Sequence, residues 1–352
     1  MKKNYLLYTI LILQISYSNA QLQLNDFITR LNDPQGLVVH EDDLYFSGTD
    51  NKIYKVNTQI QNPSPIEVFQ GGTQLRCLAV DNDILYFRQD SKISKINLTD
   101  TNPTVSDLAT NIYAYGLAIK GNELYIAERD ENRISKIDIT LGNQSPTTVK
   151  SNLNAPSDIV LKDNDLYIAE SSGNKISKID LSVTNLTLSN VITGLSDPDD
   201  LLLVNNELYI VEQLSYKVSK IDLSKPSITV EDVITNLAGP SGITFNDNCF
   251  YISQTFYATE GLQGKISTTC SPSFSINNNY EANVTIFNNP TTTKLTVSGL
   301  LHKADYKVYN IFGVEITNGE IYNNEVINFD RFSSGIYFFK LNSITTKKII
   351  VK

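Results

Sequence analysis

A dipeptide that ends in tyrosine recurs six times at nearly constant spacing, and this repeat constrains the fold of the 352-residue chain more than any other feature. The copies are Leu44-Tyr45, Leu85-Tyr86, Leu124-Tyr125, Leu166-Tyr167, Leu208-Tyr209 and Phe250-Tyr251. Successive tyrosines are 41, 39, 42, 42 and 42 residues apart. A fixed period of this length is typical of a protein built from one repeated supersecondary unit.

Each repeat is predicted to contain four short β-strands. Runs of four to six residues rich in Ile, Val, Leu and Tyr are separated by Asn, Asp, Gly or Pro, which is the pattern of strands and turns. The runs are too short for isolated helices. The run that contains Tyr125 is apolar on both faces, as expected for a sheet covered on both sides. Four strands in about 42 residues match the size of a β-propeller blade.

The N-terminal segment indicates how the ring of blades closes. Residues 26–31 match residues 232–237, which form the fourth strand of a later repeat, yet no repeat precedes residues 26–31. We expect this strand to complete the sixth blade and so to remove the free sheet edges. An open solenoid would need polar capping repeats, which the sequence does not show. The prediction is an all-β fold, with a six-bladed β-propeller over residues 21–270.

A family resemblance follows from the repeat frame. The frame Pro-x-Gly/Asp-Ile, Leu-Tyr-Ile-Ala, Asn-x-Ile-x-Lys-Ile-Asp is similar to that of six-bladed NHL-type propellers and the related gluconolactonase-like group, over residues 26–269. The resemblance implies the fold. It leaves the function open, because such propellers include binding modules, lactonases and lyases.

The first 20 residues are predicted to be a signal peptide that signal peptidase removes. Lys2 and Lys3 precede an apolar run at residues 6–15, and the small residues Ser18 and Ala20 stand at the cleavage positions. The run is shorter than the ~20 residues that span a bilayer, so an uncleaved anchor is the weaker alternative. No transmembrane segment is predicted in the mature chain.

A different unit follows the last repeat. Residues 271–280 form a polar, Asn-rich linker, and residues 281–352 alternate strands and turns, which predicts a small Ig-like β-sandwich. The blocks resemble the type A C-terminal sorting domain of the type IX secretion system of Bacteroidota. The resemblance rests on a motif set that includes Asn289, Pro290, Gly313, Gly335, Tyr337, Lys347 and Lys348.

The resemblance of the tail implies an export route. The outer-membrane translocon of the type IX system would read this domain, so the chain would pass through the periplasm and be secreted or held at the outer-membrane surface. An ordinary Ig-like module that binds a ligand is the alternative.

The three cysteines suggest one disulfide. Cys249 precedes one predicted strand and Cys270 follows the next, which places them opposite each other across a hairpin. An exported protein meets an oxidising compartment, so we expect this pair to bridge. Two unpaired, small hydrophobic side chains are the alternative. Cys77 lies in an apolar run and is predicted to be a buried core thiol.

Charge and histidine content exclude several functions. Lys and Arg total 29 against 38 Asp and Glu, a formal charge of -9, which disfavours nucleic acid as a partner. His40 and His302 are the two histidines, so a multi-histidine zinc site is excluded. Streptogramin-lyase-like propellers rely on a histidine at the channel, whereas His40 is predicted to lie at the far end of its strand. The chain contains no phosphate-binding loop or nucleophile-elbow motif.

The start of the innermost strand is where the repeats diverge. Alignment on the tyrosines places Gly36, Cys77, Gly116, Asp158, Asp200 and Gly242 at equivalent positions. The residues before them are Gln35, Arg76, Tyr115, Ser157, Asp199 and Ser241. Asp158, Asp199 and Asp200 are therefore expected to converge near one channel mouth. Convergent carboxylates bind hard cations such as Ca²⁺ or share a proton as an acid/base pair. Alternatively, they accept hydrogen bonds from local backbone N–H groups.

Further polar residues are candidates at the same face. Glu128, Glu170 and Glu212 each follow a repeat tyrosine by three residues, but their regularity favours a structural contact needed in every blade. Arg76, Arg88 and Arg129 are sporadic basic residues near this rim. They would contact an anionic or sugar ligand, or else form a solvated surface.

The sequence therefore predicts an exported propeller that is a non-catalytic binding module for an unknown glycan, small-molecule or protein ligand. The alternative is a metal-dependent, lactonase-like hydrolase that acts at the channel mouth through Asp158, Asp199 and Asp200. The chain lacks the glutamate that gluconolactonase-like enzymes carry near the first blade, because Gln35-Gly36 stands there. A protein partner held at the blade edges is a third possibility.

Overall fold

The computed structural model describes residues 22–60, 63–101, 103–255, 263–270, 285–287, 291, 294–298, 304–311, 314–323, 325–341 and 345–352. The predicted signal peptide (1–20) and linker (271–280) lie outside these ranges. The chain divides into two compact units, Met1–Cys270 and Ser271–Lys352. In the described residues, every regular element is a β-strand.

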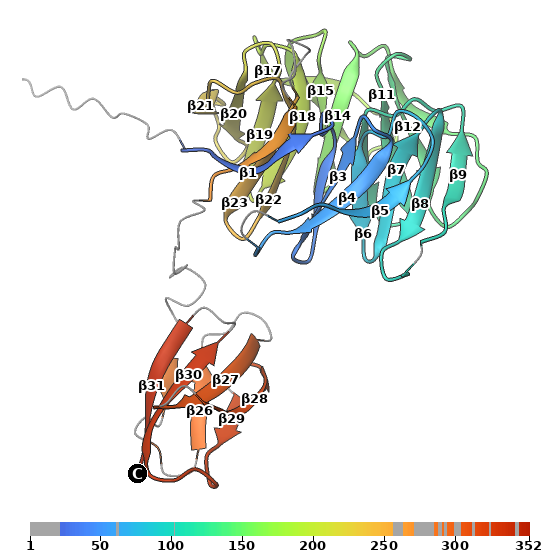
Figure 1. Cartoon of the computed structure of the whole chain (residues 1–352). Coiled ribbons are helices and arrows are strands. Elements are labelled where there is room, and N and C mark those ends of the chain that lie inside the picture. The colour runs from blue at the N-terminus through green and yellow to red at the C-terminus, as the bar shows by residue number, and fades with distance from the viewer. Residues whose placement is uncertain are drawn as a thin grey trace, which may run out of the picture. The chain divides into compact units, whose positions relative to one another are not determined.

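Six four-stranded antiparallel sheets form the first unit (Figure 1). The first blade contains β2 (Leu37–His40), β3 (Asp43–Gly48), β4 (Lys52–Asn57) and β5 (Ile66–Gln70). The second contains β6 (Leu78–Asp81), β7 (Ile84–Gln89), β8 (Lys92–Asn97) and β9 (Ser106–Thr110). The third contains β10 (Gly116–Lys120), β11 (Glu123–Glu128), β12 (Arg133–Asp138) and β13 (Thr147–Ser151). The fourth contains β14 (Pro156–Lys162), β15 (Asp165–Glu170), β16 (Lys175–Asp180) and β17 (Leu188–Thr193). The fifth contains β18 (Pro198–Val204), β19 (Glu207–Glu212), β20 (Lys217–Asp222) and β21 (Glu231–Ile234).

The sixth blade joins the two ends of the propeller, as the sequence predicts. It contains β22 (Pro240–Asn246), β23 (Cys249–Gln254), β24 (Gly264–Thr268) and, at its edge, β1 (Asn25–Leu31). β1 pairs antiparallel with β24, with Ile28 opposite Ile266, and in Figure 1 the blue β1 lies beside the last strands of the propeller. The innermost strands β2, β6, β10, β14, β18 and β22 contact one another in a closed ring.

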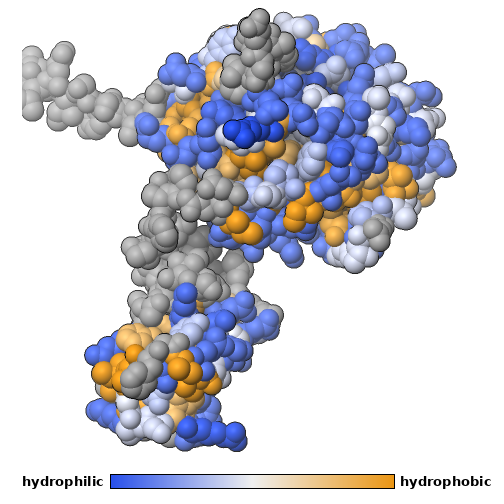
Figure 2. Space-filling model, in the orientation of Figure 1, coloured by the Kyte–Doolittle hydropathy of each residue, from blue (hydrophilic) through white to orange (hydrophobic). Residues whose placement is uncertain are grey.

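The hydrophobic core lies between neighbouring blades. Tyr167 and Ile176 of the fourth blade pack against Leu208 and Ile221 of the fifth, and the other blade pairs repeat this arrangement. All four residues of the run Leu124–Ala127 are buried. A strand with period-two alternation usually exposes one of its two faces. Both faces are buried here because a neighbouring blade covers each side of the sheet. The propeller surface visible in Figure 2 is mostly hydrophilic.

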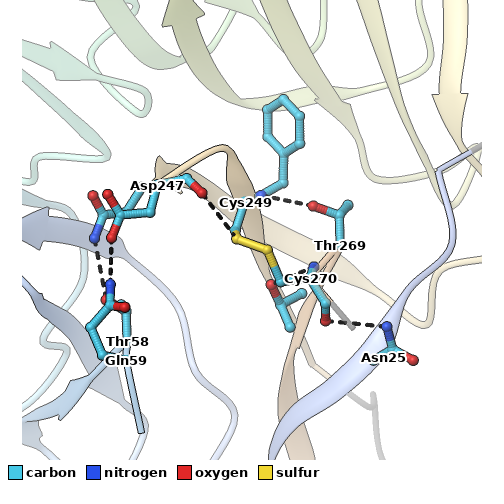
Figure 3. The surroundings of a disulfide bond; sticks show 10 residues. Asn25, Thr58, Gln59, Asp247, Cys249, Thr269 and Cys270 are labelled. Atoms are coloured by element: carbon cyan, nitrogen blue, oxygen red, sulfur yellow. Dashed lines mark hydrogen bonds between the residues drawn. A yellow bond between two sulfur atoms is a disulfide. The ribbon is translucent and has the colours of Figure 1, made fainter. Parts of the chain in front are cut away.

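A disulfide reinforces the closing blade (Figure 3). Cys249 at the start of β23 bonds to Cys270 just after β24, with their Cα atoms 5.4 Å apart. Asn25, the first residue of β1, donates a hydrogen bond from Nδ2 to the carbonyl oxygen of Cys270 at 3.2 Å. The bridge therefore lies beside the point where the N-terminal strand enters the sixth blade. Cys77 is free and buried.

The second unit is a small β-sandwich. One sheet contains β25 (Thr285–Phe287), β26 (Lys294–Ser298) and β29 (Glu325–Asn328). The other contains β27 (Ala304–Asn310), β28 (Glu315–Ile321), β30 (Gly335–Leu341) and β31 (Thr345–Val351). Leu295, Ile327, Val308 and Phe339 belong to one buried cluster that draws on both sheets.

The predicted sorting-motif residues fall in or near the last two strands where the structure describes them. Gly335 and Tyr337 lie in β30, and the Tyr337 hydroxyl donates a hydrogen bond to the Ser333 carbonyl oxygen at 2.9 Å. Lys347 and Lys348 lie in β31. Asn289, Pro290 and Gly313 lie outside the described residues. In the part of the chain that the structure describes, no helix is long and apolar enough to cross a membrane.

Candidate functional site at the channel mouth

Residues from all six blades surround a cavity of about 200 Å³ at one mouth of the central channel. The lining comes from the first five residues of the innermost strands and the residues just before them. It includes positions at which the repeats diverge and the recurring apolar position of Leu37, Leu78 and Leu117. Four of the predicted candidates line this cavity: Arg76, Asp158, Asp199 and Asp200.

β-Bulges explain how two consecutive aspartates reach the same cavity. The register of β18 against β19 shifts between Pro198 and Asp200, so Asp199 is the extra residue. The same shift occurs at the start of β14 and β22. A bulge interrupts the alternation of side chains between the two faces of a strand. Asp199 and Asp200 therefore both line the cavity.

Asp158 and Asp200 link three neighbouring blades. Asp158 Oδ2 accepts a hydrogen bond from the backbone N–H of Leu201 at 2.9 Å, and Asp200 Oδ2 accepts one from Ile243 at 2.6 Å. Each donor is 43 residues away, in the next blade, so these are not the local turn contacts considered from the sequence. Asp158 also packs against Gly116, where an added Cβ would lie 2.2 Å from Asp158 Oδ1.

The two carboxyl groups interact with each other and hold a proton. Burial raises the pKa of Asp158 well above its usual value, and the charge of Asp200 and their mutual hydrogen bond raise it further. Burial raises the pKa of Asp200 to about 7, although hydrogen bonds from Asp158 and Ile243 oppose this change. Two close carboxyl groups cannot both ionise easily, so Asp158 donates to Asp200 at neutral pH.

Asp199 lies between two arginines. Arg76 Nη2 is 3.9 Å from Asp199 Oδ2, and Arg129 Nη1 is 3.9 Å from Asp199 Oδ1. Arg129 Nη2 also lies 3.8 Å from Asp197 Oδ1. Burial raises the pKa of Asp199, while the two guanidinium groups act in the opposite direction. The mouth therefore combines a buried carboxylate with two guanidinium groups that face it.

Glu128, Glu170 and Glu212 lie inside their own blades, and none of them lines this cavity. Glu170 accepts hydrogen bonds from Asn154 N–H at 2.8 Å and from Ser177 Oγ at 2.6 Å. Glu212 makes the same contacts with Ser196 and Ser219, and it borders a separate pocket with Lys217 and Asp232. Glu128 forms a bidentate pair with Arg133, at 2.9 Å for both contacts.

The remaining sequence candidates have structural surroundings. His40 Nε2 lies 3.0 Å from Asp83 Oδ1, at the opposite end of the inner strand. Cys77 lines the cavity, but burial raises the pKa of its thiol to about 12, so it is not a reactive nucleophile at neutral pH.

Tyr115 and Arg129 complete the site; the sequence places Arg129 among the basic residues near the rim but assigns Tyr115 no role of its own. Tyr115 lines the cavity, and its ring contacts the guanidinium groups of Arg76 and Arg129. The signal for Tyr115 is its position in the repeat, which is also that of Arg76 and Asp199 and varies from blade to blade. The signal for Arg129 is weaker, because only its charge distinguishes it from Ser171 and Gln213 at the same position.

The mouth residues do not fit a Ca²⁺ site. Asp158 and Asp200 each commit one oxygen to a backbone N–H and share a proton, and Asp199 faces two positive charges. Calcium requires six to eight oxygen ligands, several of them ionised. Among the described residues, no group of three or more His, Cys, Asp or Glu side chains is placed to hold a metal ion.

Comparison with known proteins identifies the tail and the fold. Residues 285–352 match the family model described as the secretion system C-terminal sorting domain. The protein is therefore a β-propeller cargo of the type IX secretion route, and the sorting domain directs it through the periplasm to the cell surface or the medium.

The similar solved structures are β-propellers with low sequence identity. A streptogramin B lyase is 18% identical, covers 94% of this chain and 98% of its own, and has a TM-score of 0.51. An auxiliary nutrient binding protein from Bacteroides thetaiotaomicron is 12% identical over 70% of this chain and 75% of its own, with a TM-score of 0.55. A luciferin-regenerating enzyme is 10% identical, covers 70% of this chain and 94% of its own, and has a TM-score of 0.58. These likenesses show the fold alone. Among curated protein sequences, none matches the chain.

Proposed function

We propose that the propeller is a ligand-binding module and that the channel mouth is its binding site. One observation carries the proposal: Arg76, Tyr115 and Asp199 come from three blades, line one cavity, and stand at a repeat position whose residue changes from blade to blade. The next repeat position but one is apolar in every blade, as in Leu37, Leu78 and Leu117, and serves the fold. The position of Arg76, Tyr115 and Asp199 carries five residue types in six blades, which supports a role in recognition at the mouth.

The composition of the mouth favours binding over catalysis. Tyrosine and arginine are the residues most often responsible for binding energy in recognition sites, and here they surround a cavity large enough for a sugar-sized group. The nutrient binding protein among the similar structures shows that this fold is compatible with such a role. The export route would place the site outside the cell, where it meets glycans, small molecules and other proteins.

A thermal-shift screen of the chain from Gln21 to Lys352 tests the proposal. Neutral sugars, oligosaccharides and small metabolites are screened against the wild type and against a variant with Arg76→Ala and Tyr115→Ala. A Lys225→Ala variant serves as a control, because Lys225 is exposed and does not line the cavity. Ligands whose stabilisation is lost only in the double variant support the proposal. Ligands that stabilise all three proteins equally contradict it.

A hydrolase is the second candidate, and the Asp158–Asp200 pair is the observation that favours it. A pKa of about 7 for Asp200 suits proton transfer near neutral pH. The metal-dependent form of this candidate has less support, because the mouth residues do not fit Ca²⁺. Hydrolysis of lactones or esters by the wild type, lost in Asp200→Asn, would establish this candidate. Calorimetric titration of Ca²⁺ into the wild type and the Asp158→Asn, Asp200→Asn variant tests the metal directly.

A further inference from the structure

Three guanidinium groups surround the ring of Tyr115, but they differ in their hydrogen bonds. The Cζ atoms of Arg76, Arg88 and Arg129 lie 4.6, 5.5 and 5.5 Å from the ring centroid. Arg88 is buried, donates from Nε to the Asp90 carbonyl oxygen at 2.9 Å, from Nη1 to the Ala114 carbonyl oxygen at 3.1 Å, and from Nη2 to Gln74. The N–H groups of Arg88 are thus engaged in holding two loops together.

Arg76 and Arg129 have no comparable set of partners. Their contacts with Asp197 and Asp199 are 3.8 to 3.9 Å long, which is beyond hydrogen-bond distance. Within the described residues, neither guanidinium donates a hydrogen bond to the protein. Their side chains are 31% and 28% exposed, so the N–H groups are accessible from outside. A planar guanidinium with free donors is suited to bind a carboxylate or phosphate through two parallel hydrogen bonds.

The contact between Arg76 and Asp199 joins blades on opposite sides of the ring. Arg76 precedes β6 of the second blade and Asp199 lies in β18 of the fifth, while Tyr115 and Arg129 belong to the third. Each oxygen of Asp199 faces one guanidinium, and the carboxylate is only 5% exposed. Asp199 thus provides a negative charge at the place where a bound anion would meet both arginines. Stacking on Tyr115 holds the two guanidinium groups near that place.

We infer that Arg76 and Arg129 form an anion-binding site at the channel mouth, which takes a carboxylate or phosphate group of the ligand in competition with Asp199. This inference rests on the proposed function, because it names the ligand chemistry of the same mouth. The ligand anion gains the direct hydrogen bonds that Asp199 does not make, and Arg88 adds positive charge behind the ring of Tyr115.

Calorimetric titration with two simple anions tests the inference. Inorganic phosphate and malonate are titrated separately into the chain from Gln21 to Lys352, with ionic strength held constant by sodium chloride. We expect the wild type to bind at one site and the Arg76→Gln, Arg129→Gln variant to bind about tenfold more weakly or not at all. Asp199→Asn removes the competing charge, so it should bind about threefold more tightly. Lys225→Gln is the matched control, and its affinity should equal that of the wild type.

The pattern across these variants separates the inference from a general charge effect. Equal affinities in all four proteins, or weaker binding by Asp199→Asn, would overturn it. Circular dichroism melting checks that each variant is folded, and Arg129→Lys provides a second test because it keeps the charge but loses the paired donors. Binding of phosphate alone or of malonate alone identifies which anion the site prefers, and either result supports the site. If neither anion binds while a neutral ligand needs Tyr115, the inference fails and the proposed function stands.

Discussion

Two sets of buried carboxylates differ in what surrounds them. At the blade turns, Glu170 and Glu212 each accept hydrogen bonds from a backbone N–H and from a serine hydroxyl. At the channel mouth, burial raises the pKa values of Asp158, Asp199 and Asp200. The same chemical group is well solvated by the protein at one place and poorly solvated at the other. We conclude that each turn acid has its partners within one blade, whereas the mouth acids contact other blades and are buried at a cost.

Comparison between repeats strengthens this distinction. Gln89 and Gln254 take the place of the glutamates in the second and sixth blades, where each accepts from a backbone N–H and donates to a serine hydroxyl. A neutral amide can thus fill this position, with the serine hydrogen bond reversed. Glu128 differs because it pairs with Arg133, and Ser135 Oγ has no hydrogen-bond partner among the described residues. At the mouth, the position of Asp158 and Asp200 carries Gly, Cys or Asp, so a charged residue there is not a requirement of the blade.

Replacement of Glu170 should have the largest effect on stability. Glu170→Ala removes the acceptor of the Asn154 N–H and of the buried Ser177 hydroxyl, which should lower the free energy of unfolding by about 3 kcal/mol. Glu170→Gln should cost much less, because glutamine already fills this position in two blades. Chemical denaturation followed by circular dichroism measures both. Equal losses of unfolding free energy in the two variants would contradict the stabilising role of these hydrogen bonds at the turn.

The mouth pair should make stability depend on pH. Because the pKa of Asp200 is raised from 3.8 to about 7 in the folded state, the folded chain keeps a proton that the unfolded chain releases. This contribution is complete below pH 3.8 and is lost as the pH rises to about 7. Asp200→Asn should flatten that part of the profile, because the group that takes up the proton is removed while the amide oxygen can still accept from Ile243. The melting temperatures of the wild type and the variant are measured between pH 4 and 8. Parallel pH profiles of the two proteins would contradict the prediction.

Asp199→Asn should have a smaller effect on stability. Its two ionic contacts are each 3.9 Å long and involve partly exposed arginines, so the change in the free energy of unfolding should be within about 1 kcal/mol. The substitution also removes the cost of burying the charge of Asp199. Denaturation at pH 7 is the measurement. A loss as large as that of Glu170→Ala would place Asp199 with the structural acids.

Cys77→Ala should have the smallest effect. Cys77 occupies the repeat position of Asp158 and Asp200 but carries no charge, and three blades have glycine there. We expect a cost of about 1 kcal/mol or less and a pH profile identical to that of the wild type. The native thiol should also remain unlabelled by a thiol reagent at pH 8 until the chain unfolds, because its pKa is about 12. Fast labelling of the native chain would show that the cavity is open to solvent at this position.

The sequence predicts most of the fold because the fold is periodic. Six equivalent tyrosines locate the second strand of every blade, and the unmatched strand at residues 26–31 indicates how the ring closes. The same alignment brings Arg76, Asp158, Asp199 and Asp200 to one mouth.

Contacts across the ring cannot be predicted from the repeat period. The approach of Arg76 to Asp199 joins the second blade to the fifth, and no repeat period encodes a contact between opposite blades. The hydrogen bonds of Asp158 and Asp200 to the next blade depend on bulges at the strand starts, which the pattern of residues does not reveal. Tyr115 is a further example, because its role depends on three arginines that meet only in the folded chain.

Asp200 offers the most direct test of binding at the mouth, because its carboxyl group reports on charge inside the cavity. Carbon NMR of the aspartate carboxyl groups follows its titration with and without inorganic phosphate. A bound anion favours the protonated form, so the apparent pKa of Asp200, about 7 in the free protein, should rise in phosphate. The rise should vanish in the Arg76→Gln, Arg129→Gln variant. An unchanged titration in the wild type, or the same rise in the variant, would contradict binding at this site.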